Sequence, residues 1–188
     1  RCLSTLVLSS AGGVRAQSAP HNTVEFWGGM AGWSGENASG FSTGPATGAT
    51  LLFHIGIPVQ VGLDLGFARM DSDQIVEEVD EFLACLAARY RFSFVPRVYP
   101  FVGIQAGYTR LSAEYATLRF EQNGGLVGGS AGFEIPMGSR LMLLGMGGVA
   151  YYGYRDTTVF LDDVPVSSTG GNAWRYWFRL GLSFRWGP

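Results

Sequence analysis

Residues 174–186 alternate between two kinds of side chain, and this pattern constrains the fold more than any other feature of the chain. Successive side chains point to opposite faces of a β-strand, so the stretch predicts a strand with one wholly apolar face and one face that is largely charged or small. Such a strand suits a wall between lipid and a polar interior. The apolar parity holds Trp174, Tyr176, Phe178, Leu180, Leu182, Phe184 and Trp186, and the other parity holds Arg175, Trp177, Arg179, Gly181, Ser183 and Arg185.

The composition agrees with a wall that faces lipid. Charged residues make up only 15% of the 188 residues, against about 25% in typical soluble domains. No apolar run approaches the ~18 residues of a membrane helix. The length fits one domain, and the formal net charge of -2 with no basic patch makes nucleic-acid binding unexpected.

The first 16 residues resemble a secretory signal. An apolar stretch is followed by small residues and by Val14-Arg15-Ala16, a plausible cleavage pattern. We therefore expect cleavage after Ala16, a short periplasmic segment at 17–22 and a barrel domain at 23–188. Cys85 would then be the one remaining cysteine, which rules out an intrachain disulfide.

Runs of period-2 alternation predict eight strands, at 23–33, 47–57, 59–70, 80–94, 100–113, 124–135, 140–153 and 173–186. The connections alternate between short segments that carry Pro and long polar segments. The long segments are 34–46, 71–79, 114–123 and 154–172. Short periplasmic turns and long extracellular loops are typical of outer-membrane barrels. The sequence thus predicts an all-β, eight-stranded, antiparallel, up-and-down transmembrane β-barrel with both termini in the periplasm.

Strand parity places eight charged residues in the barrel interior. An eight-stranded barrel is only wide enough to be filled by side chains, so charges inside it must pair. We expect a salt-bridged plug, with Glu25 near Arg185 where the first and last strands meet. The parity of the seventh strand is not assigned by its sequence. The predicted interior network comprises Glu25, Asp64, Arg89, Arg91, Glu134, Arg175, Arg179 and Arg185.

Aromatic residues gather near the predicted strand ends, which favours two girdles at the membrane–water interfaces. The girdle candidates are Phe26, Trp33, Phe92, Phe94, Tyr99, Phe101, Tyr115, Tyr151, Tyr152, Tyr154, Trp174 and Trp186.

The segment from Asp71 to Glu81 holds six carboxylates in eleven residues. One interpretation is a site for divalent cations that bridge to lipopolysaccharide phosphates. The favoured interpretation is a solvated loop. No pair of histidines has metal-ligand spacing, so we expect no metal site and no cofactor.

The chain resembles the small eight-stranded outer-membrane barrels: the OmpA transmembrane domain, OmpX and the opacity-type adhesins. The resemblance covers residues 22–186, and its most specific part is the C-terminal β-signal at Arg179, Gly181, Phe184 and Trp186. It implies that the outer-membrane assembly machinery reads this strand, and that outer-membrane lipids and lipopolysaccharide surround the barrel. The family commonly ends on its last aromatic residue, whereas here Gly187-Pro188 follow Trp186.

Four functions remain open at this point. The leading hypothesis is a non-catalytic barrel with a structural or surface-interaction role through its long extracellular loops. The second is a narrow pore, and the third is a soluble lipocalin-like barrel with the apolar faces turned inward. The fourth is a lipid A-modifying enzyme. Lipid A deacylases of this shape use a His with a Ser two residues on, but Gly56 follows His54 at that spacing and Thr23 follows His21. Catalysis is therefore not expected.

Overall fold

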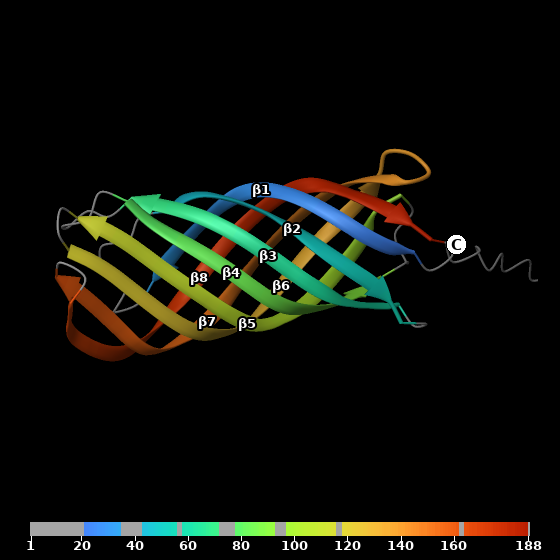
Figure 1. Cartoon of the computed structure of the whole chain (residues 1–188). Coiled ribbons are helices and arrows are strands. Elements are labelled where there is room, and N and C mark those ends of the chain that lie inside the picture. Colours follow the sequence, from blue (N-terminus) through green and yellow to red (C-terminus); the bar gives the residue numbers. More distant parts are fainter. Residues whose placement is uncertain are drawn as a thin grey trace, which may run out of the picture.

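The chain forms a closed barrel in which every strand pairs antiparallel with its neighbours in chain order, and β8 pairs with β1 (Figure 1). The computed structural model describes residues 21–34, 43–55, 58–71, 78–92, 97–115, 118–161 and 164–187. The predicted signal segment at 1–16, its cleavage site and residues 17–20 of the predicted periplasmic segment lie outside these residues. The strands are β1 (Asn22–Ser34), β2 (Gly44–His54), β3 (Val59–Asp71), β4 (Glu78–Arg91), β5 (Tyr99–Tyr115), β6 (Leu118–Pro136), β7 (Leu141–Leu161) and β8 (Val164–Trp186). This confirms the predicted fold class.

The two faces of β8 separate as its alternation predicts. Phe178 and Leu180 on the outer face are 53% and 51% exposed, whereas Arg179 between them is 1% exposed. The other strands also turn large apolar side chains outward, for example Leu86 and Ile104. The lipocalin-like alternative required the opposite arrangement and is wrong. Among the described residues there is no helix with the length and apolarity of a membrane span.

The structure assigns the faces of β7, which its sequence left open. From Leu141 to Tyr154, where the register shifts, the even-numbered residues of this strand point inward and the odd-numbered ones point outward. The inward set includes Met142, Leu144, Met146, Ala150, Tyr152 and Tyr154, and the outward set includes Leu143, Val149 and Tyr151.

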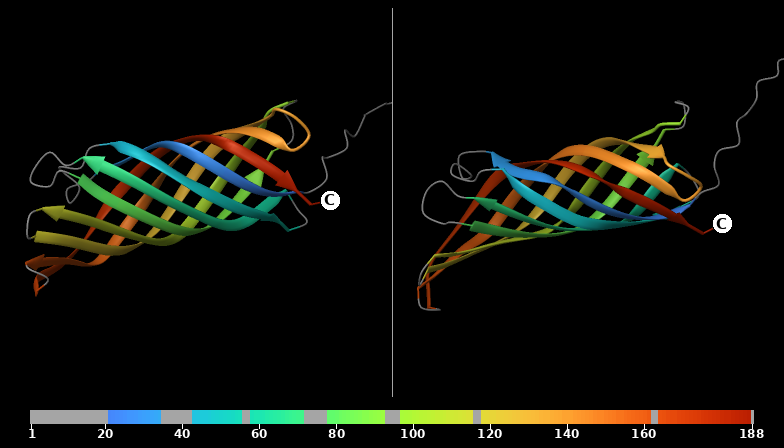
Figure 2. Two further views of the ribbon diagram at one scale, coloured as in Figure 1. Left: turned by 45° about the horizontal axis from the view of Figure 1, so that its top comes forward. Right: turned by 90° about the horizontal axis from the view of Figure 1, so that it is seen from above.

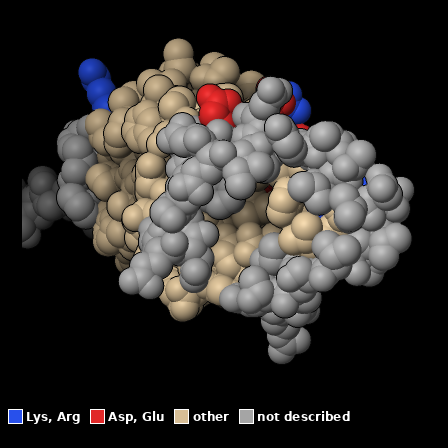
Figure 3. All heavy atoms as spheres, turned by 90° about the vertical axis from the view of Figure 1, so that its left-hand side faces the viewer, with Lys and Arg blue, Asp and Glu red and all other residues tan. Residues whose placement is uncertain are grey.

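The barrel has two distinct ends. We call the end at which β1 begins and β8 finishes the terminal end; there, Asn22 pairs with Trp186. The opposite end, which we call the distal end, faces the viewer in Figure 3, where described acidic and basic side chains show together at one edge. The short Pro-containing connection expected between the predicted strands 124–135 and 140–153 is observed at the terminal end, between Pro136 and Leu141.

Two of the predicted long loops are wrong. Segments 114–123 and 154–172 fall largely within paired strands, because β5 and β6 pair as far as Tyr115 and Leu118, and β7 and β8 pair as far as Leu161 and Val164. Adjacent antiparallel strands need only a two-residue link, so the backbone ladder continues through residues whose composition suggested loops. β5 to β8 are therefore longer than β1 to β4, and they extend farther at the distal end (Figures 1 and 2).

Several aromatic residues predicted for the girdles lie inside the barrel instead. Trp33, Tyr152 and Tyr154 pack together near the distal end, with 4.4 Å between the ring centroids of Trp33 and Tyr152. Phe101 is also buried. Strand parity decides the face of each ring, whatever its distance from the strand end. Tyr151 and Trp174 do lie outside, with their ring centroids 5.3 Å apart.

Candidate functional site

The interior next to the terminal end holds a cluster of ion pairs centred on Glu25 and Glu134. Arg89 of β4 donates from Nη1 and Nη2 to the two carboxylate oxygens of Glu25, at 2.5 and 2.9 Å. The same Nη1 lies 3.1 Å from Glu134 on β6. Arg91 binds Glu134 at 2.6 Å, and Arg185 lies 3.8 Å from it. We call these five residues the terminal cluster.

The expected pairing of Glu25 with Arg185 is wrong. The register between β1 and β8 places Ser183 opposite Glu25 and Thr23 opposite Arg185. Glu25 therefore takes its partner from β4, across the lumen, because a narrow barrel brings inward side chains of opposite strands into contact.

A second ion pair crosses the middle of the lumen. Arg179 of β8 donates from Nη1 to Asp64 of β3 at 2.8 Å, and both side chains are almost fully buried. Thr50 donates to the other oxygen of Asp64 at 2.7 Å, and the indole N–H of Trp27 donates to Thr50 at 3.2 Å. The guanidinium carbon of Arg179 lies 3.7 Å from the centre of the Trp27 ring. Both oxygens of Asp64 thus accept hydrogen bonds, and the guanidinium of Arg179 contacts the Trp27 ring.

A third ion pair involves a carboxylate that the sequence interpretation placed in the acidic loop. Glu81 is completely buried and accepts from Arg175 at 2.8 and 2.9 Å and from the Tyr152 hydroxyl at 3.1 Å. The signal that would have found it is parity, because Glu81 shares its face of β4 with Leu83, Cys85 and Arg89.

Two other carboxylates of the acidic segment, Glu78 and Asp80, are also paired. Arg69 on β3 binds Asp80 at 2.8 Å and Glu78 at 3.2 Å on the exposed outer surface. Residues 72–77 lie outside the described residues. Within the described part of the chain, no group of three or more His, Cys, Asp or Glu side chains has the arrangement to hold a metal ion.

Among the described residues, the interior charges nearly cancel. Four carboxylates, at Glu25, Asp64, Glu81 and Glu134, face the five arginines at 89, 91, 175, 179 and 185. The structure thus places all eight residues of the predicted network inside and adds Glu81. Aromatic rings accommodate the guanidinium groups further: Arg89 lies 4.1 Å from the centre of the Phe101 ring, and Arg185 lies 5.4 Å from that of Tyr99.

The lumen is packed between and beyond these ion pairs. An interior void beside Asp64, Arg89 and Arg179 has a volume of about 20 Å³, which is room for about one water molecule. Towards the distal end, the charges give way to an apolar layer that contains Trp33, Met70, Val79 and Tyr154, all buried. In the described interior, the apolar layer therefore lies near the distal end, and the ion pairs at Glu25, Glu134 and Asp64 lie near the terminal end and the middle, beside a smaller apolar cluster of Phe101, Leu144 and Met146.

The residues of the predicted β-signal divide between the two faces of β8. Arg179 points inward to Asp64, while Phe184 and Trp186 point outward and are 41% and 39% exposed. Gly181 lies where β8 approaches β1 closely, because a Cβ atom built there would lie 2.3 Å from the Phe26 carbonyl oxygen. Gly181 therefore has a packing reason of its own, independent of recognition.

The whole barrel matches a known protein family. Residues 3–186 match the family model described as outer membrane protein beta-barrel domain. The chain belongs to this family and is a bacterial outer-membrane β-barrel protein, which agrees with its apolar outer face and its closed sheet. A comparison with curated protein sequences finds no significant match.

Solved structures of outer-membrane barrels share the fold at low sequence identity. Neisserial surface protein A aligns with a TM-score of 0.64 and 14% identity over 88% of this chain and 97% of that one. OprG of Pseudomonas aeruginosa aligns with 0.60 and 12% over 90% and 97%. The N-terminal barrel of Pseudomonas aeruginosa OprF aligns with 0.53 and 13% over 89% and 98%. At these identities the likeness shows the fold alone.

Proposed function

We propose that this protein is a non-catalytic outer-membrane barrel whose lumen is closed and whose role is structural or depends on contacts at its distal end. The observation that carries the proposal is the interior, where three sets of buried ion pairs cross the lumen between strands that are not neighbours. An aqueous path would have to pass all three. Buried, paired charges resist separation, because removing one partner leaves an uncompensated charge.

The distal end faces the cell exterior in this proposal. Outer-membrane barrels place their termini in the periplasm, so the extended ends of β5 to β8 would stand on the extracellular side. Segments 34–46 and 71–79, together with these extended hairpins, would make the surface contacts. Lipopolysaccharide and outer-membrane lipids would surround the wall, and the assembly machinery would read Arg179, Gly181, Phe184 and Trp186.

The surroundings of the two histidines support a non-catalytic role. A histidine that acts as a general base needs a hydrogen bond to the nucleophile that it activates. The Nδ1 atom of His21 is buried without a hydrogen-bond partner. The described contact of His54 is through its backbone N–H, which donates to Asn22 at 3.1 Å.

Conductance in planar bilayers tests the closed lumen. We expect no stepwise current from the purified barrel under conditions in which a general porin conducts. Discrete single-channel steps that disappear with heat-denatured protein would overturn the proposal in favour of the narrow pore. Mass spectrometry of lipid A from cells that overproduce the protein tests the non-catalytic part, since an enzyme would change the lipid A mass.

A further inference from the structure

The terminal end, which lies on the side of the C label in Figure 1, holds the positive charge that the interior does not cancel. Elsewhere in the described lumen, one guanidinium group faces one carboxylate. In the terminal cluster, two carboxylates face three guanidinium groups, and Glu25 is already held through both of its oxygens by Arg89. Glu134 is therefore left to serve both Arg91 and Arg185, and the cluster keeps a net charge of +1.

Arg185 is the guanidinium group of this cluster that lacks a carboxylate of its own. Its Nη2 atom lies 3.8 Å from Oε2 of Glu134, which is too long for a hydrogen bond. Nη2 of Arg91 lies 2.6 Å from the same oxygen, so the two Nη2 atoms are at most 6.4 Å apart, the sum of these distances. Nε and Nη2 of Arg185 and Nε of Arg91 are buried without an acceptor among the described protein atoms. Two cations thus lie close together with unused hydrogen-bond donors.

These side chains come from strand ends, so they border the mouth of the lumen. Arg91 is the last residue of β4, Tyr99 is the first of β5, and Arg185 is the last but one of β8. The side chains of Arg185 and Arg91 are 9% and 17% exposed. Their guanidinium carbons lie 5.4 and 5.8 Å from the centre of the Tyr99 ring. Both cations therefore surround one position at the mouth.

The surroundings of this position add positive charge and no further acidic side chain. Arg97 lies in the turn between β4 and β5 and Arg140 in that between β6 and β7; both are exposed, and neither forms an ion pair within the described part of the chain. Outside the terminal cluster, the acidic residues of the described ranges lie in the middle of the barrel or toward the distal end. The neighbouring segments of the sequence that the structure does not describe contain no Asp or Glu, at 1–20, 56–57, 93–96 and 188.

We propose that the terminal mouth binds one small oxyanion, of the class of phosphate or sulfate, through the guanidinium groups of Arg185 and Arg91 beside Tyr99. A guanidinium group presents its N–H donors as a planar fork that matches the oxygens of such an anion. Water can accept these hydrogen bonds but leaves the charge in place, whereas an oxyanion accepts them and neutralises the charge. The site needs neither a closed lumen nor a particular orientation of the barrel, so it stands apart from the proposed function.

Isothermal titration calorimetry of the folded barrel with sodium phosphate, in an uncharged detergent at low ionic strength, tests this site. We expect one saturable site on the unaltered protein and at least tenfold weaker binding on Arg185→Gln, because charge-assisted hydrogen bonds are lost. Arg97→Gln is the matched control, since it removes an exposed arginine from the same end and should bind phosphate normally. Heat-modifiable migration on gels shows that each variant is folded, and Arg185→Lys takes the place of Arg185→Gln if the latter does not fold.

Unfolding gives a second measurement, because a ligand that binds only the folded barrel raises its unfolding midpoint. At constant ionic strength, phosphate should raise the urea midpoint of the unaltered protein and of Arg97→Gln more than that of Arg185→Gln. The general effect of phosphate on protein surfaces is the same for all three proteins, so the difference between them reports the site.

Four outcomes would overturn the proposal. The first is the absence of saturable heat with phosphate, which would leave water as the partner of these donors, and the second is equal phosphate binding by Arg185→Gln. The third is chloride binding of equal strength, because the site would then not select an oxyanion. The fourth is binding of a short-chain phosphatidylglycerol without binding of inorganic phosphate, which would assign the site to a lipid headgroup.

The α-carboxylate of a chain that ends at Pro188 is the remaining competitor for this position. A form of the protein extended by three glycines beyond Pro188 is therefore titrated as well. It should bind phosphate with the same affinity as the unextended protein. Phosphate binding by the extended form alone would show that the α-carboxylate occupies the site, and would also overturn the proposal.

Discussion

Arg175 on β8 reaches across the lumen to Glu81 on β4, and its Nε and Nη2 atoms lie 2.9 and 2.8 Å from the same carboxylate oxygen. The two strands are not neighbours in the sheet. The ion pair therefore ties opposite walls of the barrel together, in addition to the backbone ladder that joins adjacent strands.

Replacing Glu81 by Gln should destabilise the barrel by about 3–5 kcal/mol, because Arg175 is then left as a buried charge without its partner. Urea unfolding in lipid vesicles, followed by tryptophan fluorescence, measures this change. The control is Glu78→Gln on the same strand, whose exposed contact with Arg69 contributes little. Equal effects of the two substitutions would contradict a stabilising interior pair. A double variant, Glu81→Leu/Arg175→Leu, should recover part of the loss.

Phe184 and Phe178 offer a matched test of the β-signal, because both are outward-facing phenylalanines on β8. We expect Phe184→Ala to reduce assembly in cells, measured as the heat-modifiable barrel in outer-membrane fractions. Phe178→Ala should assemble normally. Since both side chains are partly exposed, the two purified variants should refold in detergent to a similar extent. Equal assembly of both variants in cells would show that Phe184 is not read as a signal.

Gly181 should be sensitive even to a methyl group. A Cβ atom there would lie 2.3 Å from the Phe26 backbone oxygen, and such overpacking typically costs about 1–3 kcal/mol. Gly153→Ala is the comparison, because its Cβ atom enters open space and a compatible Gly→Ala change tends to stabilise by about 0.4–1 kcal/mol. Unfolding midpoints of the two purified variants measure the difference. If Gly181→Ala is as stable as Gly153→Ala, the β1–β8 contact is looser than described.

Cys85 reports whether water reaches the lumen. The chain beginning at Gln17 carries Cys85 as its single thiol, and this side chain is 3% exposed inside the barrel. We expect a charged methanethiosulfonate reagent to modify it only after unfolding, as mass spectrometry would show. A Gly138→Cys variant supplies an exposed thiol that should react in the folded state. Rapid modification of Cys85 in the folded barrel would indicate an aqueous path.

The sequence predicted the fold well because period-2 alternation is a local signal with a single geometric meaning. On β8 it separated Arg179 from Phe178 and Leu180, and the structure agrees. It failed where composition replaced parity. Glu81 was grouped with the acidic segment 71–81 and left out of the interior network, although the predicted strand 80–94 includes it and its parity matches that of Arg89.

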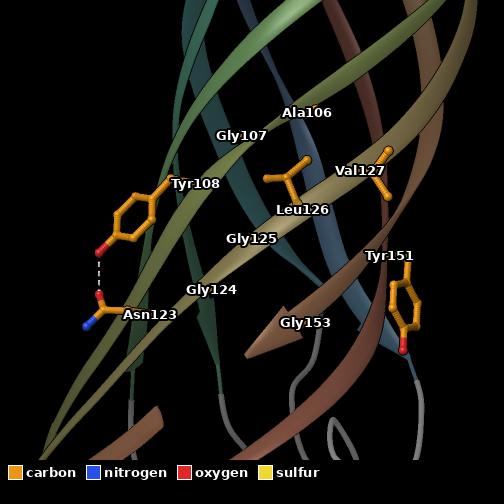
Figure 4. A pocket seen from close by; sticks show the side chains of 10 residues that line it. All are labelled: Ala106, Gly107, Tyr108, Asn123, Gly124, Gly125, Leu126, Val127, Tyr151 and Gly153. Carbon is orange, nitrogen blue, oxygen red and sulfur yellow. Dashed lines mark hydrogen bonds between the residues drawn. The ribbon is translucent and has the colours of Figure 1, made fainter. Parts of the chain in front are cut away.

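The specific partners inside the barrel could not be predicted in the same way. Parity gives the face of the sheet on which a residue lies. It does not give the position of the residue along the barrel axis or the residue across the lumen from it, because both depend on register and strand tilt. For this reason Glu25 was expected near Arg185 and is found with Arg89. A groove on the outer face, lined by Gly125, Gly153 and Tyr108 among others, also escaped prediction (Figure 4). It forms because Gly125 and Gly153 are neighbours on adjacent strands, which depends on the register of β6 and β7.

The distribution of arginines gives the last strand a special place in folding. Arg175, Arg179 and Arg185 all come from β8, and their carboxylate partners lie on β4, β3 and β6. A sheet of the first seven strands would leave Asp64 and Glu81 without these cations, so a partly closed barrel is penalised electrostatically. The arrival of β8 both seals the sheet and neutralises its interior. Closure should therefore be all-or-none, and a chain that lacks this strand should not persist as a stable open sheet.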